Sequence, residues 1–367
     1  MRPTIRLGRI AGIEVGVHWS LLVIGVLLVG SLAGVVLPGS APDAHGSYLA
    51  AAILAVLLFF ASILAHELAH SIVARRQGQA VDGITLWLLG GVSKLGTEPK
   101  NAKEELRVSL AGPLTTLVLA AVFAGLGFAF DAVIAPGTLL PTVALWLAFV
   151  NVLLGVFNLL PGAPLDGGRV LAALLWKHNG DRRRSQISAA RAGRVLGALI
   201  LAGSIVALFG GYDFFVTAIV GLFVLSASRQ EETSARLMRT IDDRTVGELM
   251  RPIAHSAPDW TTVAAFGPVA EPTILLGWDG APTALLPPGA VFAVPPDARE
   301  HVQLRTLGLP IGGLAHAPAG VRATAVVTAG ALPVLVDDAD GRPVGVFGLD
   351  ELKIAAHRDP VLARADR

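Results

Sequence analysis

Long apolar runs separated by short polar segments make up roughly the first 228 residues of the chain. An α-helix of about 20 apolar residues is long enough to cross the roughly 30 Å hydrocarbon core of a membrane. Six runs reach or approach this length, the last two being short: residues 19–37, 49–74, 106–130, 142–160, 195–209 and 214–227. The pattern therefore predicts an α-helical polytopic membrane protein with about six transmembrane helices.

The composition agrees with a membrane protein. The 367 residues are 53% hydrophobic and 16% charged, whereas soluble domains are usually about one quarter charged. The net charge of +1 gives no reason to expect a nucleic-acid partner. The chain has no cysteine, which excludes disulfides, Cys-ligated zinc and thiol catalysis. Because cysteine is absent, any transition metal must be held by His, Asp or Glu. The N-terminal segment lacks the apolar core and cleavage site of a signal peptide.

Basic residues lie on one side of the predicted membrane region only. They precede the first run and lie between the second and third runs and between the fourth and fifth. The connections on the opposite side contain neither Lys nor Arg: residues 38–48, 131–141 and 210–213. Cytoplasmic loops carry the excess of basic residues. We therefore expect a multi-pass protein of the plasma membrane with both termini in the cytoplasm.

The second apolar run contains the sequence His66-Glu67-Leu68-Ala69-His70. Residues four apart lie on one face of a helix, so His66 and His70 can bind one metal ion, and Glu67 can accept a proton from the attacking water. His66 lies roughly 26 Å along the helix from residue 49, at about 1.5 Å per residue. The motif is therefore expected inside the membrane, near its cytoplasmic face, where polar groups are costly unless they line a wet cavity or bind a ligand.

The fourth run ends in a segment that must interrupt a helix, because Pro161, Pro164 and the glycine pair Gly167-Gly168 follow Asn158. Asp166 is the only carboxylate in this break, and it is the candidate for the third metal ligand that a catalytic zinc site needs. The alternative is that Asp166 caps a helix over residues 167–176. Asn158 is a candidate for a hydrogen bond to an oxyanion or to substrate backbone, or for an interhelical hydrogen bond. Arg169 either steadies this site or lies at the cytoplasmic interface.

The paired motifs, His66-Glu67-x-x-His70 and Asn158-x-x-Pro161 followed by Asp166-Gly167-Gly168, resemble those of the site-2 proteases, the intramembrane zinc metalloproteases. The resemblance implies Zn²⁺ on His66, His70 and Asp166, with Glu67 as the catalytic base and Asn158 in substrate or transition-state contact. Residues 83–95 resemble the family's membrane-associated β-hairpin. Thr116 stands where the family more usually has Asn, and no insertion between the runs is large enough for a PDZ domain.

This resemblance implies regulated intramembrane proteolysis. Zinc lowers the pKa of its water towards 7, and Glu67 takes the proton and returns it to the leaving amine. A helical substrate must unwind, and adding it as a strand to the hairpin at 83–95 supplies replacement hydrogen bonds. The expected partners are the lipid bilayer and single-span membrane proteins, such as a membrane-tethered anti-sigma factor, with helix-weakening residues near the cytoplasmic side.

The chain changes character after the sixth run. We expect a transmembrane metalloprotease domain over residues 1–228, a polar linker over 229–244 and an α/β cytoplasmic domain over 245–367. Residues 245–250 are expected to open a first half-repeat, and residues 332–337 and 341–347 to form a hairpin in a second. Both resemble a pair of cystathionine-β-synthase (CBS) domains. An adenine nucleotide on this domain is left open, because Gly348 replaces the usual hydroxyl residue and Asp350 comes one position early. The alternative to a nucleotide sensor is a degenerate pair that serves as a homodimerisation or docking module.

Two other functions compete with the protease. A non-catalytic scaffold that binds transmembrane segments has no need of a base at Glu67. A nucleotide-gated transporter predicts inverted repeats and polar residues spread over several spans, whereas the polar residues of this chain gather in two runs. The protease is therefore the preferred hypothesis.

Overall fold

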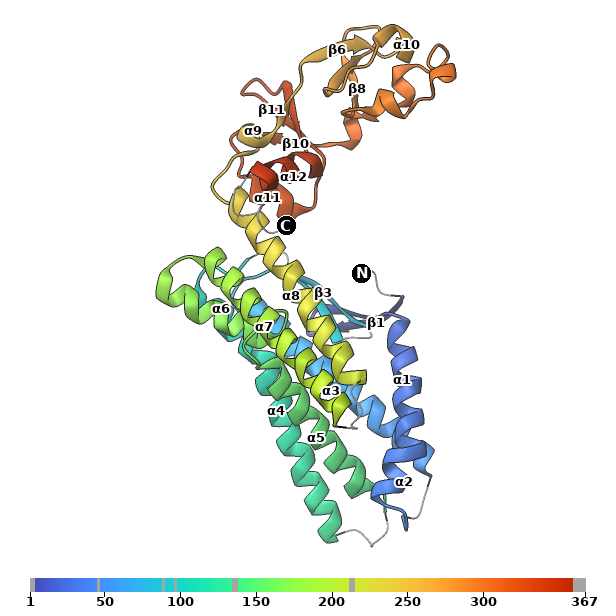
Figure 1. Ribbon diagram of the computed structural model, residues 1–367, viewed down its shortest axis with the longest axis vertical. Coiled ribbons are helices and arrows are strands. Elements are labelled where there is room, and N and C mark those ends of the chain that lie inside the picture. Colours follow the sequence, from blue (N-terminus) through green and yellow to red (C-terminus); the bar gives the residue numbers. More distant parts are fainter. Residues whose placement is uncertain are drawn as a thin grey trace. The chain divides into compact units, whose positions relative to one another are not determined.

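The computed structural model describes residues 4–44, 47–87, 90–95, 98–133, 138–210 and 215–358. The chain forms two compact units, Met1–Thr233 and Ser234–Arg367, of which the first is mostly helical and the second is α/β (Figure 1). The predicted domain boundaries at residues 228 and 244 stay predictions. Each unit is described by itself.

Among the described residues, five helical segments of the first unit are long and apolar enough to cross a membrane. The first joins α1 (Ser20–Ser31), a π-helical turn (Leu32–Val36) and α2 (Leu37–Ser40). The others are α3 (Tyr48–Arg76), α4 (Ala102–Val133), α5 (Leu140–Asn158) and α7 (Arg182–Phe209). The sixth predicted run begins at residue 214, outside the described residues, and continues into α8 (Phe215–Ile241). The polytopic helical class is confirmed, and the count of six stays a prediction.

The helices pack through small residues and leave large apolar side chains outside. A Cβ on Gly155 of α5 would lie 2.9 Å from Leu117 Cδ2 of α4, and one on Gly127 of α4 would lie 2.7 Å from Leu145 Cδ2 of α5. Such close backbone approach is typical of helix packing in membranes. Val26, Val118 and Phe149 are each more than 60% exposed, which suits contact with lipid rather than water.

A four-stranded sheet in the order β1-β2-β3-β4 covers part of this bundle. It consists of β1 (Ile5–Ile10), β2 (Ile13–Val17), β3 (Val81–Trp87) and β4 (Gly90–Leu95). The predicted hairpin at 83–95 is thus confirmed as β3 and β4, which pair antiparallel. The N-terminal strands were not predicted, and β2 joins β3 in parallel. Ile13 and Ile84 are almost fully buried against α1 and α3, so the sheet is fixed to the helix that carries His66, and β4 is its terminal strand.

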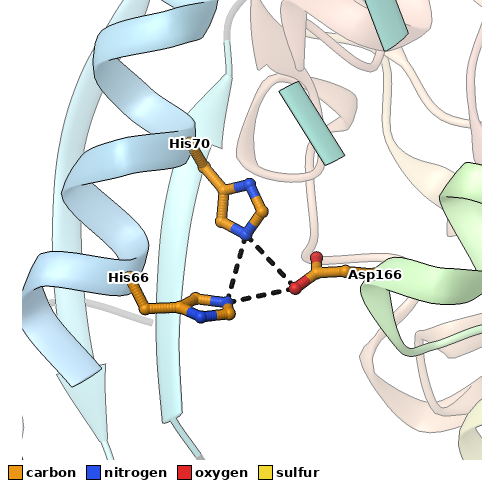
Figure 2. Close-up of side chains that lie close together, drawn as sticks. All are labelled: His66, His70 and Asp166. Carbon is orange, nitrogen blue, oxygen red and sulfur yellow. Dashed lines mark hydrogen bonds and ion pairs between the residues drawn. The ribbon is translucent and has the colours of Figure 1, made fainter. Parts of the chain in front are cut away.

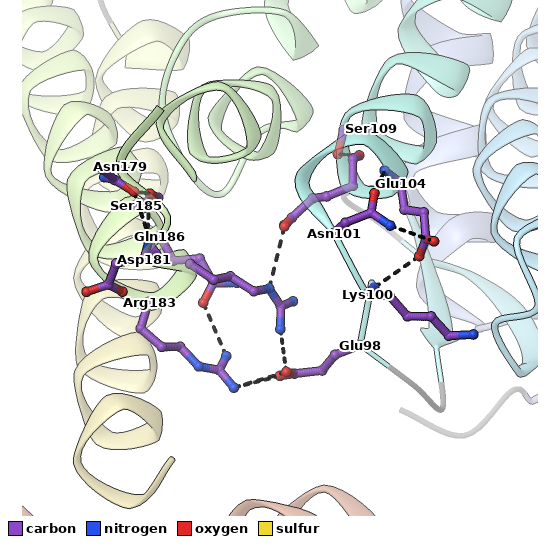
Figure 3. Close-up of polar contacts among 12 residues, drawn as sticks. Glu98, Lys100, Asn101, Glu104, Ser109, Asn179, Asp181, Arg183, Ser185 and Gln186 are labelled. Atoms are coloured by element: carbon purple, nitrogen blue, oxygen red, sulfur yellow. Dashed lines mark hydrogen bonds and ion pairs between the residues drawn. The ribbon is translucent and has the colours of Figure 1, made fainter. Parts of the chain in front are cut away.

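The predicted helix break lies between α5, which ends at Asn158, and α6 (Asp166–Asn179). The C-terminal end of α6 turns at Gly180, whose φ of +73° suits glycine. Asp181 then caps α7 by accepting a hydrogen bond from the Arg184 N–H at 2.8 Å. A cluster of ion pairs joins this corner to the segment that follows β4. Glu98 pairs with Arg183 (Figure 3) and also with Arg182. Glu105 of α4 lies 3.5 Å from the Arg182 Nε.

The second unit contains two repeats of one α/β topology. The first has β6 (His255–Pro258), α10 (Val263–Phe266), β7 (Thr273–Leu276) and β8 (Pro282–Leu286). The second has β10 (Ala315–Pro318), α11 (Ala323–Ala329), β11 (Val334–Asp337), β12 (Pro343–Phe347) and α12 (Leu349–Arg358). In each repeat a parallel pair is followed by an antiparallel hairpin. This confirms the hairpin expected at 332–347 and the paired half-repeats that the CBS resemblance implies.

Each repeat pairs with a short strand that adjoins the other repeat in the sequence, and this corrects one prediction. Residues 245–250 do not open the first repeat: α9 (Val246–Leu249) contributes Val246 to the core that contains Phe347 of the second repeat. The short strand β5 (Arg251–Pro252) then pairs with β12, and β9 (Leu309–Pro310) pairs with β8. The prediction failed because it assumed that residues directly before the first repeat in the sequence also pack against that repeat.

Candidate metal centre

His66 and His70 lie one turn apart on α3, and both residues are buried, with 5% and 9% of their surface exposed. Figure 2 shows their imidazoles projecting toward the Asp166 carboxylate at the start of α6. The Asp166 Oδ2 lies 3.0 Å from the His66 Nε2 and 3.2 Å from the His70 Nε2. The two Nε2 atoms are 3.2 Å apart. The three side chains therefore form a compact triangle of potential ligand atoms.

Helix α4 orients both imidazoles through their other ring nitrogens. The His70 Nδ1 lies 2.7 Å from the Val108 carbonyl oxygen. The His66 Nδ1 lies 2.8 Å from the Thr116 Oγ1, whose hydroxyl lies 3.1 Å from the Gly112 carbonyl oxygen. Carbonyl oxygens only accept, so the His70 Nδ1 carries a hydrogen, and Thr116 donates to Gly112 while accepting from His66. The hydrogen of each neutral imidazole is thus on Nδ1, which leaves the Nε2 lone pairs for a metal.

The donor set fits a zinc ion. Two Nε2 lone pairs and a carboxylate oxygen are all acceptors, and they repel one another at 3.0 to 3.2 Å unless a cation lies among them. Ligands at about 2.05 Å from a tetrahedral zinc would be separated by about 3.3 Å. The triangle has nearly this size already. Two histidines, one carboxylate and an open fourth position are typical of catalytic zinc.

Asp166 does not cap α6. It is the first residue of the helix, and the residue in the capping position is Leu165, whose side chain makes no capping hydrogen bond. The Asp166 carboxylate is instead directed at the two histidines. The alternative interpretation of Asp166 as a helix cap is therefore wrong.

Gly112 of α4 leaves the room that a metal needs. A Cβ on Gly112 would lie 2.2 Å from the His70 Nε2 and 2.6 Å from the His66 Nε2. Both distances are far below van der Waals contact, so any side chain here would occupy the space between the ligands. The absence of a side chain at residue 112 is a requirement of the site.

Glu67 lies against the edge strand of the sheet. A Cβ on Gly91 of β4 would lie 2.2 Å from the Glu67 Cγ and 3.0 Å from its Oε1. The backbone of β4 therefore passes directly over the Glu67 carboxylate. A peptide added to the outer edge of β4 would lie alongside the carboxylate of Glu67, the residue that follows His66 in the sequence.

Asn158 is the last residue of α5, and its Nδ2 donates to the Leu154 carbonyl oxygen at 3.0 Å. This bond lies within one helix rather than between helices. An amide has two N–H groups, so the prediction that Asn158 contacts the substrate stays open. Arg169 is exposed on α6.

In the second unit, Glu351 rather than Asp350 faces the backbone N–H of Gly348, at 3.0 Å, and it pairs with the Arg251 Nε at 3.3 Å. Binding of an adenine nucleotide by this unit stays open.

A candidate His-His-carboxylate metal site with a further carboxylate beside it, on helices able to cross a membrane, is the arrangement expected of a membrane-embedded metallohydrolase. The comparisons with known proteins agree with this class. The model of peptidase family M50 matches residues 54–139 and 134–203. "Putative zinc metalloprotease Rip3" of Mycobacterium tuberculosis is 41% identical over 358 residues, covering 91% of this chain and 90% of the relative.

A second relative, "Zinc metalloprotease MJ0392" of Methanocaldococcus jannaschii, is 32% identical over 253 residues, covering 69% of this chain and 67% of the relative. The solved site-2 protease from the same organism is 31% identical, with 62% of this chain and 94% of that chain covered and a TM-score of 0.43. The chain belongs to peptidase family M50, the site-2 proteases. It is an integral membrane protein and an intramembrane zinc metalloprotease.

Sequence reasoning did not find the groups that support the metal ligands. Thr116 was seen only as a departure from a family pattern, and Val108 contributes a backbone oxygen that no side chain signals. The close approach of Gly112 to the two histidines was not predicted either. Gly91 was one of two adjacent glycines in the predicted hairpin, and that pair was the available signal of a close approach.

Proposed function

We propose that His66, His70 and Asp166 hold the catalytic zinc and that Glu67 is the general base of peptide hydrolysis. The observation that carries this proposal is the convergence of three acceptor atoms within 3.2 Å of one another, with both Nδ1 atoms already committed to α4. Bound zinc polarises the scissile carbonyl and lowers the pKa of water to about 7.

Glu67 accepts a proton from the attacking water and passes it to the leaving amine, since one carboxylate can serve both steps in turn. Asn158 donates its second N–H to the oxyanion that develops on the scissile carbonyl, or to the substrate backbone beside it. The chain's own residues thus supply proton transfer and orientation around the metal.

The proposed substrates are single-span membrane proteins, with membrane-tethered regulators such as anti-sigma factors as the leading class. Their unwound segment adds as a strand to β4, the terminal strand of the sheet, whose Gly91 lies over Glu67. Strand addition replaces the hydrogen bonds that a substrate helix gives up. A substrate with a helix-weakening residue near the cytoplasmic side should be cut faster than a helix-stabilised version, and equal rates would contradict this mode of binding.

The test measures metal content and cleavage together in full-length protein purified in detergent. Wild type and Glu67→Gln should each contain about one zinc per chain, but Glu67→Gln should not cleave a panel of single-span substrates. Asp166→Ala should lose both zinc and cleavage, whereas Asp131→Ala, which removes an exposed carboxylate of α4, should lose neither. A wild type that binds transmembrane segments tightly, holds no zinc and cuts nothing would support the scaffold instead.

We also propose that both termini face the cytoplasm, because Lys and Arg are confined to one side of the helices. The cysteine-free chain allows a direct test with single introduced cysteines. In intact cells an impermeant maleimide should label Ser40→Cys but should label Ser256→Cys only after permeabilisation. The reverse pattern would invert the orientation.

A further inference from the structure

The position of Asp166 depends on the seven-residue connection that precedes it, residues 159–165. The N-cap residue of α6 makes no side-chain hydrogen bond that would fix the first turn. The path of the preceding backbone therefore sets the position of the Asp166 Cα and, through it, of the carboxylate. Within the connection, the Gly162 N–H donates to the Leu160 carbonyl oxygen at 2.8 Å and the Leu165 N–H donates to the Gly162 carbonyl oxygen at 3.1 Å. These short bonds shape the connection, but they do not fix it to the rest of the unit.

Ala163, three residues before Asp166, is held from outside on both of its backbone polar groups. Its N–H donates to the Ala189 carbonyl oxygen of α7 at 3.2 Å. Its carbonyl oxygen accepts from the Ser228 hydroxyl of α8 at 2.5 Å. Ala163 is 7% exposed and Ser228 is fully buried. The connection is therefore fixed to two helices at one residue.

Gly193 of α7 permits this contact. A Cβ there would lie 1.9 Å from the Ala163 carbonyl oxygen and 2.6 Å from the Ser228 Oγ. A Cβ on Gly162 would likewise lie 2.5 Å from the Gly193 Cα. The backbone of α7 thus lies against these groups at a distance that only glycine allows.

One turn after Ser228, an ion-pair group fixes α8 to α7. The Glu232 side chain is 5% exposed and accepts from the Arg191 Nε at 3.1 Å and from the Arg194 Nη1 at 2.8 Å. Ser228 and Glu232 are four apart and so share a face of α8. The hydroxyl that reaches Ala163 is therefore carried by a helix held in place beside it.

We propose that Ser228 is a positioning residue for the metal ligand Asp166, acting through its hydrogen bond to the Ala163 carbonyl oxygen. This inference rests on the proposed role of Asp166 as a zinc ligand. The competing interpretation is purely local, because the Ser228 hydroxyl also lies 2.6 Å from the Val224 carbonyl oxygen, and helical serines commonly bond to the carbonyl four residues earlier. Ser226 provides the matched control, since its exposed hydroxyl bonds to the Phe223 carbonyl oxygen at 3.0 Å.

The experiment uses the full-length zinc protein in detergent and measures the rate of zinc release to a chelator, alongside steady-state cleavage. Ser228→Ala should release zinc about tenfold faster than wild type, on the scale of one lost buried hydrogen bond. Its kcat should fall with little change in KM, because the substrate strand binds elsewhere. Ser226→Ala should match wild type in both. Zinc release from Ser228→Ala at the wild-type rate would overturn the inference.

Two further variants keep the outcomes distinct. If Ser228→Ala does not yield folded protein, Ser228→Cys replaces it, since a thiol is similar in shape but a weaker donor; it should release zinc at an intermediate rate, and wild-type release would overturn the inference. Asp166→Ala reports on the proposed function separately. If it retains zinc, the ligand assignment fails; if it loses zinc while both Ser228 variants behave as wild type, only the positioning role fails.

Discussion

The two sides of the metal centre are built in different ways. The histidines occupy neighbouring turns of one helix, and each ring is oriented by a direct hydrogen bond from its Nδ1 to α4. Asp166 is the first residue of α6 and follows a connection between helices, whose backbone is held by α7 and α8. The histidine side depends on contacts of the ligand rings themselves, whereas the aspartate side depends on contacts three residues away. Changes near the histidines should therefore act on metal binding directly.

The largest effect is expected from Gly112→Ala. The added Cβ would lie 2.2 Å from the His70 Nε2 and 2.6 Å from the His66 Nε2, so either the metal or the helix packing must give way. Metal ligands must be placed to within about 0.5 Å, and we expect zinc content and cleavage both to fall close to zero. Metal analysis of the purified variant checks this.

Gly125→Ala is the control on the same helix, because a Cβ there meets no atom within 4 Å. It should keep wild-type zinc and activity. If Gly112→Ala retained full zinc with intact cleavage, the close packing of α4 on the histidines would be incorrect.

Gly91→Ala should separate the base from the metal. Its Cβ would lie 2.2 Å from the Glu67 Cγ but belongs to the strand rather than to α4. A shift of about 1 Å in a catalytic group can lower the rate about 100-fold, so we expect a loss of that size in kcat with zinc content unchanged. Loss of zinc together with activity would mean that β4 supports the metal site as a whole.

Thr116→Val tests the hydrogen bond that orients His66. The change leaves the His66 Nδ1 hydrogen without its partner at 2.8 Å. Loss of such an outer partner typically lowers metal affinity by about 10- to 100-fold, measured here by competition with a chelator. Thr115→Val is matched to it, because the Thr115 hydroxyl donates to the Ala111 carbonyl oxygen within α4 at 2.8 Å. Equal zinc affinities for the two variants would contradict the role of Thr116.

The same contrast explains what could be predicted from the sequence. The i, i+4 spacing of His66 and His70 is a local property of a helix, and prolines at 161 and 164 must end one, so the candidate histidine pair and the helix break followed from short segments. The roles of these histidines and of Asp166 as metal ligands stay predictions. The groups that support them come from positions distant in sequence, such as Val108, which is 38 residues from His70, and Ser228, which is 65 residues from Ala163. A single sequence carries no signal for such pairings. The pairing of β2 with β3 was missed for the same reason, since it joins strands on either side of α1 and α3.

The smallest effect is expected from Arg183→Ala, at the corner that joins α7 to the segment after β4. The Arg183 side chain is 10% exposed and its Nη2 lies 2.9 Å from the Glu98 Oε1, but Glu98 is 44% exposed (Figure 3). A charged hydrogen bond contributes about 1.5 to 3 kcal/mol, and the exposure of Glu98 reduces this, so a loss of about 1 kcal/mol is expected. The thermal midpoint in detergent should fall by about 2 to 4 °C. Zinc affinity should be unchanged, because this ion pair involves neither Ala163 nor Ser228. Arg184→Ala, which removes an exposed neighbour, should leave the midpoint within about 1 °C of wild type. Should Arg183→Ala instead weaken zinc binding as much as Thr116→Val, the aspartate side would depend on the whole of α7 rather than on the contacts at Ala163.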